Sequence, residues 1–100
     1  MSNADDDYFF IFVRNFVKYA LNIGKAAQRE IRSLDQTVRT RVIKAIRTLN
    51  NPRPAGCIKL AGSSNLWRIR IGDWRVLYEI ADENKEVIIV GVRHRSRAYD

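Results

Sequence analysis

The stretch Leu66–Arg75 constrains the fold most strongly, because apolar and basic side chains alternate along it on both sides of Gly72-Asp73. Alternation of this kind is typical of half-buried strands, and a Gly-Asp pair between two such runs is typical of a tight hairpin turn. The hairpin sets Arg70 opposite Arg75, and directly opposed residues share a face of the sheet. The predicted apolar face carries Trp67, Ile69, Ile71, Trp74, Val76 and Tyr78. The opposite face carries Arg68, Arg70 and Arg75.

A third strand is predicted at Val87–Val92, after a short polar loop. Pairing Ala81 with Val87 sets Arg93 opposite Arg75, whereas a slip by one residue would turn Arg93 into the core. The apolar face then gains Ile88, Val90 and Val92, and the other face unites Arg68, Arg70, Arg75 and Arg93. Like charges set opposite one another destabilise a sheet and serve no purpose in a core. The cluster therefore indicates a polyanionic partner.

The segments before the hairpin predict a short strand and two helices. Lys18–Ile23 has the pattern of a strand, whereas Lys25–Leu34 and Thr37–Leu49 carry apolar residues at helical spacing. Asp35 suits the turn between the helices and can cap the second one, and so short a gap favours an antiparallel helical hairpin. Pro52–Gly62 is expected to be a loop that leads into a three-stranded antiparallel meander. The predicted fold class is α+β, in the order β-α-α-β-β-β.

Composition narrows the class of protein further. One hundred residues make one domain, and 46% apolar content supports a modest core. The formal net charge of +7 favours nucleic acid or another anionic surface as a partner. The single cysteine, Cys57, excludes an internal disulfide framework and a Cys-rich zinc site. With no secretory or membrane-spanning pattern, the cytoplasm is the expected location.

Several catalytic arrangements are absent from the sequence. It has no glycine-rich phosphate motif and no ligand set at metal-binding spacing, and its lone His94 lacks the partners of a serine triad. Guanidinium groups, in contrast, match phosphate oxygens and can stabilise the added charge of a pentacoordinate phosphorane. RNA supplies its own nucleophile, the 2′-hydroxyl, and Tyr99 and His94 are the nearby candidates for proton transfer. The residues alone leave two interpretations: a metal-independent ribonuclease without cofactors, or a nucleic-acid-binding module.

Several motifs fall in order along most of the chain. They are Lys25-Ala-Ala-Gln-Arg-Glu-Ile-x-x-Leu34, Asn51-Pro-Arg53, Lys59-Leu60-x-Gly62, Trp67-Arg-Ile-Arg-Ile-Gly-Asp-Trp-Arg-Val-Leu-Tyr-Glu-Ile80 and Val90-Gly-Val-Arg-His-Arg-Ser-Arg-Ala-Tyr99. Together they resemble the RelE toxins of bacterial and archaeal toxin–antitoxin systems. The resemblance covers Lys18–Asp100, the expected toxin domain, and implies a compact domain with the helices on one face of one sheet. It also implies cleavage of mRNA in the ribosomal A site and silencing by a co-expressed antitoxin.

The resemblance assigns roles to individual residues. Arg75 and Arg93 correspond to the catalytic arginines of such toxins, which steady the phosphate in the transition state. Tyr99 corresponds to the C-terminal tyrosine that stacks on the RNA base and is a candidate general base. Arg68 and Arg70 stand where the best-studied type has lysines; because arginine does not readily give up a proton, both are assigned to phosphate binding. Further RNA contacts are expected from Lys59, His94 and Arg95.

Residues 1–17 lie outside the resemblance and are expected to be an extension, either a cloning remnant or an upstream segment. Within this extension, the apolar spacing of Tyr8–Val17 favours a helix. Trp67 and Trp74 are interpreted as core residues rather than base-stacking ones, because they share a face with Ile69 and Val76.

The predicted function is that of a ribosome-dependent mRNA endoribonuclease toxin, with products that end in a 2′,3′-cyclic phosphate and a 5′-hydroxyl. Its expected partners are the ribosome, mRNA and a RelB-like antitoxin. No membrane partner is expected, and no homo-oligomer except one held together by the antitoxin. Because a fold does not fix a function, two alternatives stay open. The first is a ParE-like toxin that inhibits DNA gyrase without cutting RNA, and the second is a basic RNA-binding module without catalysis.

Overall fold

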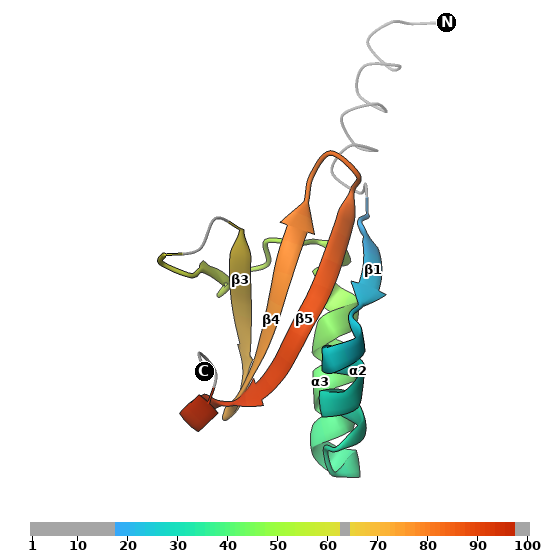
Figure 1. Cartoon of the computed structure of the whole chain (residues 1–100), viewed down its shortest axis with the longest axis vertical. Coiled ribbons are helices and arrows are strands. Elements are labelled where there is room, and N and C mark those ends of the chain that lie inside the picture. Colours follow the sequence, from blue (N-terminus) through green and yellow to red (C-terminus); the bar gives the residue numbers. More distant parts are fainter. Residues whose placement is uncertain (1–17, 63–64, 98–100) are drawn as a thin grey trace, which may run out of the picture.

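The computed structural model describes residues 18–62 and 65–97, which form one five-stranded sheet with two α-helices on one of its faces (Figure 1). The strands are β1 (Ala20–Ile23), β2 (Ile58–Lys59), β3 (Leu66–Ile71), β4 (Trp74–Ala81) and β5 (Glu86–His94). The helices are α2 (Lys25–Arg32) and α3 (Gln36–Arg47). The 3-10 turn η1 (Thr48–Asn50) follows α3, and the 3-10 turn η2 (Arg95–Arg97) follows β5. The predicted α+β class is confirmed. The helix expected at Tyr8–Val17 lies outside the described residues.

The sheet has the strand order β1-β5-β4-β3-β2. Its centre is the predicted antiparallel meander of β3, β4 and β5, and the hairpin register sets Arg70 opposite Arg75 as expected. β1 runs parallel to β5 at one edge, a pairing that requires the long crossover supplied by the helices. β2 pairs with β3 at the other edge, so the expectation of an unbroken loop over Pro52–Gly62 is wrong. The strand β2 has only two residues, which is too short for an alternating pattern to reveal it in the sequence.

Part of the register predicted for the third strand is wrong, because the structure contains a β-bulge there. Arg75 faces Arg93 as expected, but the pairing shifts by one residue at Val90, which has no direct partner on β4. Beyond the bulge, Ala81 faces Glu86 rather than its expected partner. The core positions predicted for Ile88 and Val90 are instead taken by Val87 and Ile89, both fully buried. Because of the bulge, Val87 and Ile89 face the core while Arg93 still pairs with Arg75.

The two helices are tied together at the turn between them. The side chain of Asp35 accepts a hydrogen bond from the Val38 N–H at 3.0 Å and so caps α3, as predicted. Arg39 then reaches back to the end of α2, where carbonyl groups have no partner within the helix. Its guanidinium donates to the carbonyl oxygens of Ile31, Arg32 and Leu34. Arg39 therefore links α3 to the end of α2 by three hydrogen bonds.

The core lies between the helices and the apolar face of the sheet. Its fully buried side chains include Ala27, Val42, Leu49, Val76, Tyr78, Val87 and Ile89. Trp67 and Trp74 are partly buried and pack against this cluster, which confirms their interpretation as core residues. The Tyr78 hydroxyl donates to the carbonyl oxygen of Pro52 at 2.8 Å, and burial raises the pKa of that hydroxyl.

Asp82 joins three segments at the end of the sheet that carries the β4–β5 loop. Its carboxylate accepts two hydrogen bonds from Arg53, at 3.2 and 2.9 Å, and one from the Tyr19 hydroxyl at 2.7 Å. The hydrogen bonds from Arg53 and then Tyr19 lower the pKa of Asp82 from 3.8 to about 2. The start of β1 and the loop after η1 are thereby fixed to the β4–β5 loop.

Candidate functional site

Three arginines lie in a row across three adjacent strands of the sheet. Arg70 on β3 is the direct partner of Arg75 on β4, and Arg75 is the direct partner of Arg93 on β5. Direct partners share a face, so the three side chains leave the sheet on the side away from the helices. Arg70 is exposed, whereas Arg75 and Arg93 are half-buried. We call these three residues the arginine row.

Arg75 is held by the hairpin turn beside it. Its Nη1 atom donates to the carbonyl oxygen of Gly72 at 3.2 Å and to that of Trp74 at 3.1 Å. Gly72 has a φ of +60°, a conformation that side chains with a Cβ rarely adopt. A Cβ at Gly72 would also lie 3.0 Å from the Arg41 guanidinium, which reaches the turn from α3. Two guanidinium groups thus lie beside one tight turn.

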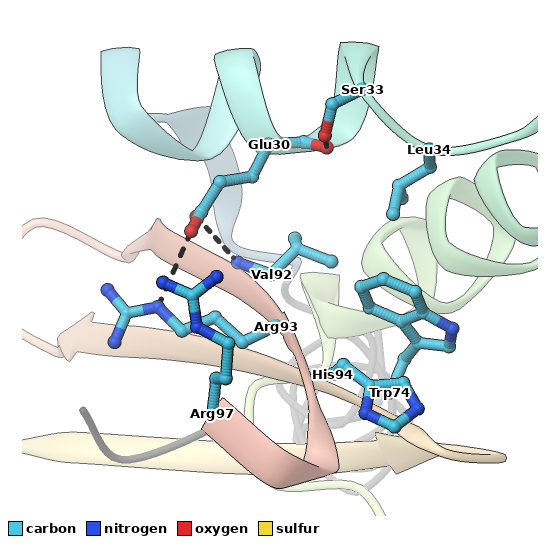
Figure 2. A pocket seen from close by; sticks show the side chains of 8 residues that line it. All are labelled: Glu30, Ser33, Leu34, Trp74, Val92, Arg93, His94 and Arg97. Atoms are coloured by element: carbon cyan, nitrogen blue, oxygen red, sulfur yellow. Dashed lines mark hydrogen bonds and ion pairs between the residues drawn. The ribbon is translucent and has the colours of Figure 1, made fainter.

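Arg93 is held from the opposite direction, by Glu30 on α2 (Figure 2). The Arg93 Nε lies 3.4 Å from the Glu30 Oε2 atom and donates to it. The other oxygen of the same carboxylate, Oε1, accepts the backbone N–H of Val92 at 3.0 Å. Arg97 on η2 points its guanidinium toward the same carboxylate. One acidic side chain therefore meets two basic ones at the edge of β5.

A cavity of about 430 Å³ lies beside this contact, between the end of α2 and the end of β5. Its apolar wall consists of Leu34, Trp74 and Val92. Its polar rim consists of Glu30, Ser33, Arg93, His94 and Arg97. The cavity connects the Arg93 end of the arginine row with the helix-covered side of the sheet.

Arg68, the fourth arginine predicted for this face, differs from the others in burial. It lies two residues before Arg70 on β3 and is only 6% exposed. Its cross-strand partners are Leu77 on β4 and Ile58 on β2. Arginines that are buried to this degree are almost always paired, and Arg68 interacts with another group of the chain. Its burial favours a supporting role, so Arg70 is the better candidate for direct contact with a phosphate.

His94 and Lys59 do not lie on the side of the sheet that carries the arginine row, which we call the arginine face. His94 is the partner of Trp74 and shares its side of the sheet, with the two rings edge to face at 5.4 Å. Lys59 is likewise the partner of Trp67, and its Nζ lies 5.9 Å from the centroid of that ring. Tyr99 lies outside the described residues.

Arg95 is fixed to the hairpin turn just beyond the end of the row. Its backbone N–H donates to the Asp73 carbonyl oxygen at 2.7 Å, and its Nε lies 4.0 Å from the carboxylate of the same residue. Both side chains are exposed, so the ion pair itself contributes little. The backbone bond, rather than the charge pair, places η2 against the turn.

Sequence reasoning missed Glu30, Arg41 and Arg97 as neighbours of the row. One signal for Glu30 was present, because it is the only acidic residue in the strongly basic segment from 25 to 34. Arg41 offered no such signal, since basic residues recur along the whole of α3. The contact of Glu30 with β5 spans 62 residues of sequence and depends on how α2 packs on the sheet.

The arrangement is suited to binding an anion with several oxygen atoms. A guanidinium offers parallel donors that match phosphate oxygens, and adjacent strands hold several such groups at fixed spacing. Within residues 18–62 and 65–97, no three His, Cys, Asp or Glu side chains come together as a metal site would require. No helix in the same ranges is long and apolar enough to span a membrane.

The comparisons with known proteins agree with the fold. The family model described as ParE toxin of the type II toxin–antitoxin system parDE matches residues 21–99. None of the curated proteins compared with the chain matches it. Fold and match together define a toxin of a type II toxin–antitoxin system. Within that class, the chain belongs to the RelE/ParE superfamily.

Solved structures of toxin–antitoxin proteins are similar over most of their length. The toxin–antitoxin complex RelBE2 from Mycobacterium tuberculosis contains a chain that matches with a TM-score of 0.72 and 26% identity, over 79% of this chain and 100% of that one. A chain of the archaeal RelE–RelB complex from Pyrococcus horikoshii matches with a TM-score of 0.70 and 30% identity, over 81% of this chain and 99% of that one. The isolated RelE toxin of E. coli matches with a TM-score of 0.69 and 27% identity, over 81% of this chain and 88% of that one. The family model is thus described as ParE, whereas these solved structures are of RelE systems.

Proposed function

We propose that this chain is a metal-independent endoribonuclease that cleaves mRNA on the ribosome and so inhibits translation. The observation that carries the proposal is the arginine row, Arg70–Arg75–Arg93, in register on three adjacent strands. Like charges opposite one another cost stability, and a phosphodiester placed over them would relieve the repulsion. The similarity to solved RelE toxins supports the same reaction.

The proposed reaction needs positioning and charge stabilisation more than a protein nucleophile. The RNA 2′-oxygen attacks the neighbouring phosphorus, and the bond from phosphorus to the 5′-oxygen breaks. Arg75 and Arg93 stabilise the extra negative charge of the phosphorane, as preorganised donors do in other phosphoryl and acyl transfers. Arg70, the exposed member of the row, binds a flanking phosphate. The products are a 2′,3′-cyclic phosphate and a 5′-hydroxyl.

Two protons must move in this reaction, one from the 2′-hydroxyl and one to the leaving 5′-oxygen. The arginines cannot supply this step, because a guanidinium stays protonated in proteins. His94 lies on the side of the sheet opposite Arg75, since it pairs with Trp74. Tyr99 is therefore the preferred candidate for taking the proton of the 2′-hydroxyl, and it stacks on the base in the same proposal. Solvent water supplies the proton that the leaving 5′-oxygen takes up.

An antitoxin partner belongs to the same proposal. Similar toxin chains were solved in RelE–RelB and RelBE complexes. With a net charge of +7, this chain would attract an acidic partner segment, which we expect to lie over the helices or over the arginine face. Co-expression with the neighbouring gene product should restore growth that the chain alone stops.

Primer extension on mRNA translated in a reconstituted system tests the proposal. Wild-type protein should create new ends within codons at the A site, and Arg75→Ala should abolish them. Lys18→Ala is the matched control, because it removes one exposed positive charge outside the arginine row. No new ends with wild-type protein, or equal cutting by Arg75→Ala, would refute the proposal.

A second candidate is a ParE-like toxin that inhibits DNA gyrase and cuts no RNA. The family match over residues 21–99 favours it. A supercoiling assay with purified gyrase separates the two, since only a gyrase toxin should block supercoiling while translated mRNA stays intact. RNA affinity without cleavage, unchanged in Arg75→Ala, would instead indicate a non-catalytic binding module.

A further inference from the structure

We propose that Glu30 is a positioning residue, which holds the Arg93 guanidinium in the orientation that the phosphorane requires. The inference rests on the proposed ribonuclease function and adds a residue that lies outside the arginine row. It also gives a role to a carboxylate whose presence beside a phosphate site otherwise opposes binding. Glu30 acts through Arg93 and does not itself touch the RNA.

The contact is anchored at an open edge of the sheet. β1 pairs with β5 only from Glu86 to Ile89, so no other strand of the described residues covers the outer edge of β5 beyond Ile89. The Val92 N–H at this edge donates to Glu30 Oε1 at 3.0 Å. An edge N–H that is only partly exposed needs such an acceptor. The backbone N–H of Val92 thus fixes the Glu30 carboxylate independently of its contact with Arg93.

Gly91 makes room for the crossing of the two side chains. It is buried, and a Cβ at this position would lie 3.4 Å from both Glu30 Oε1 and Arg93 Nε. These contacts are at the tight end of ordinary van der Waals packing. Alanine would touch both groups at this distance, whereas a larger side chain would press on the ion pair.

Glu30 holds the Arg93 guanidinium at its Nε side. Glu30 engages the Nε atom at 3.4 Å, and Figure 2 shows the two Nη atoms of Arg93 directed away from the carboxylate. The Glu30 and Arg93 side chains are about one-third exposed, at 32% and 31%. A free arginine side chain would lose much rotational freedom on binding phosphate, and a prior bond at Nε reduces that loss. The pair is therefore arranged as a preorganised phosphate ligand.

Two effects of removing the Glu30 charge have opposite signs, which makes the inference testable. Without the carboxylate, the anionic RNA meets one negative charge fewer, so its binding should be unchanged or tighter. The Arg93 guanidinium, however, would lose its orientation, and the rate of the chemical step should fall. A merely structural role for Glu30 would lower both together, through loss of folded protein.

The experiment measures cleavage of mRNA on programmed ribosomes under single-turnover conditions, using the full chain. Glu30→Gln keeps an oxygen acceptor for the Val92 N–H but loses the charge that holds Arg93. We expect its cleavage rate to fall about 10- to 100-fold, the range for a misplaced catalytic group. Its Kd for ribosomes carrying mRNA with a 2′-deoxy residue at the cleavage site should not rise. Glu83→Gln, an exposed carboxylate in the β4–β5 loop, is the matched control and should behave as wild type.

Two further variants link the effect to Arg93. In an Arg93→Ala background, Glu30→Gln should cause no further loss of rate, since the group that it positions is gone. Glu30→Asp keeps the charge but is shorter by one methylene, so it should lose rate without tighter binding. If Glu30→Gln fails to fold, Glu30→Asp and the wild-type NMR signal of the Arg93 Nε–H, which the contact should protect from solvent exchange, still decide the inference.

The outcomes separate the inference from the proposed function. Wild-type protein that cuts no translated mRNA would refute the ribonuclease function and the role of Glu30 with it. Cutting by wild type with an equal rate for Glu30→Gln, or a full further loss of rate in the Arg93→Ala background, would refute the role of Glu30 alone.

Discussion

Arg75 and Arg93 face each other directly on β4 and β5, yet their guanidinium groups are tied to different partners. Arg75 donates from Nη1 to the carbonyl oxygens of Gly72 and Trp74, whereas Arg93 donates from Nε to Glu30. Each arginine is thus oriented by the chain before any ligand binds. The repulsion expected of opposed like charges is reduced because each charge has its own acceptors.

Arg68 and Arg70 are expected to respond differently to truncation, although they are two residues apart on β3. Arg68 is 6% exposed, so Arg68→Ala should remove buried packing and lower the free energy of unfolding by about 1–3 kcal/mol. Arg70 is exposed, so Arg70→Ala should leave the free energy of unfolding unchanged. Urea denaturation of both variants measures these values.

The same pair should differ in RNA binding. Arg70→Ala should weaken binding of a non-cleavable RNA and reduce the slope of log K against log salt by about 1, as for one lost phosphate contact. Arg68→Ala, measured where it is folded, should leave that slope unchanged. An unchanged slope for Arg70→Ala would show that Arg70 makes no phosphate contact.

Gly72→Ala tests the turn that holds Arg75. The φ of +60° is unfavourable for alanine by about 1–2 kcal/mol, and the new Cβ would also lie 3.0 Å from the Arg41 guanidinium. Gly56→Ala is the matched control, because Gly56 has a φ of +88° but nothing within 4 Å of the added Cβ. Gly72→Ala should therefore be the more destabilising of the two in urea denaturation. Equal losses would mean that the Arg41 side chain moves aside at no cost.

Much of the arginine face could be predicted from the sequence, because period-two alternation and a two-residue turn together fix both register and facing. The bulge at Val90 could not, since the run from 87 to 90 is apolar throughout and offers no alternation to mark an extra residue. The role of Glu30 could not be predicted either, because it depends on where α2 crosses the edge of β5. Local pattern determines which face a side chain occupies, whereas its partners across elements come from packing.

Tyr78→Phe tests the buried hydroxyl that joins β4 to the start of the loop after η1. Tyr78 is fully buried and donates to the Pro52 carbonyl oxygen at 2.8 Å, so its loss leaves a buried acceptor unsatisfied. We expect the free energy of unfolding to fall by about 1–3 kcal/mol. Tyr19→Phe, which removes a solvent-exposed hydrogen bond to Asp82, is the control and should cost less. Equal effects in urea denaturation would contradict the assignment of the larger role to burial.

Asp82 should make the stability of the fold depend on pH in the acid range. Its pKa in the folded chain is about 2, below the ordinary 3.8, because Arg53 and Tyr19 donate to the carboxylate. The unfolded chain therefore takes up a proton more readily than the folded chain between these two values. The stabilisation is fully present above pH 4 and is lost as the pH falls from about 4 towards 2.

Melting temperatures measured between pH 2 and pH 6 check the Asp82 prediction. Wild type should lose melting temperature over this interval, and Asp82→Asn should show a flatter profile, because its amide does not titrate. Glu83→Gln, the neighbouring exposed position, should keep the wild-type profile. A profile for Asp82→Asn as steep as that of wild type would place the acid sensitivity in other carboxylates, and the contact of Asp82 with Arg53 would then contribute nothing to it.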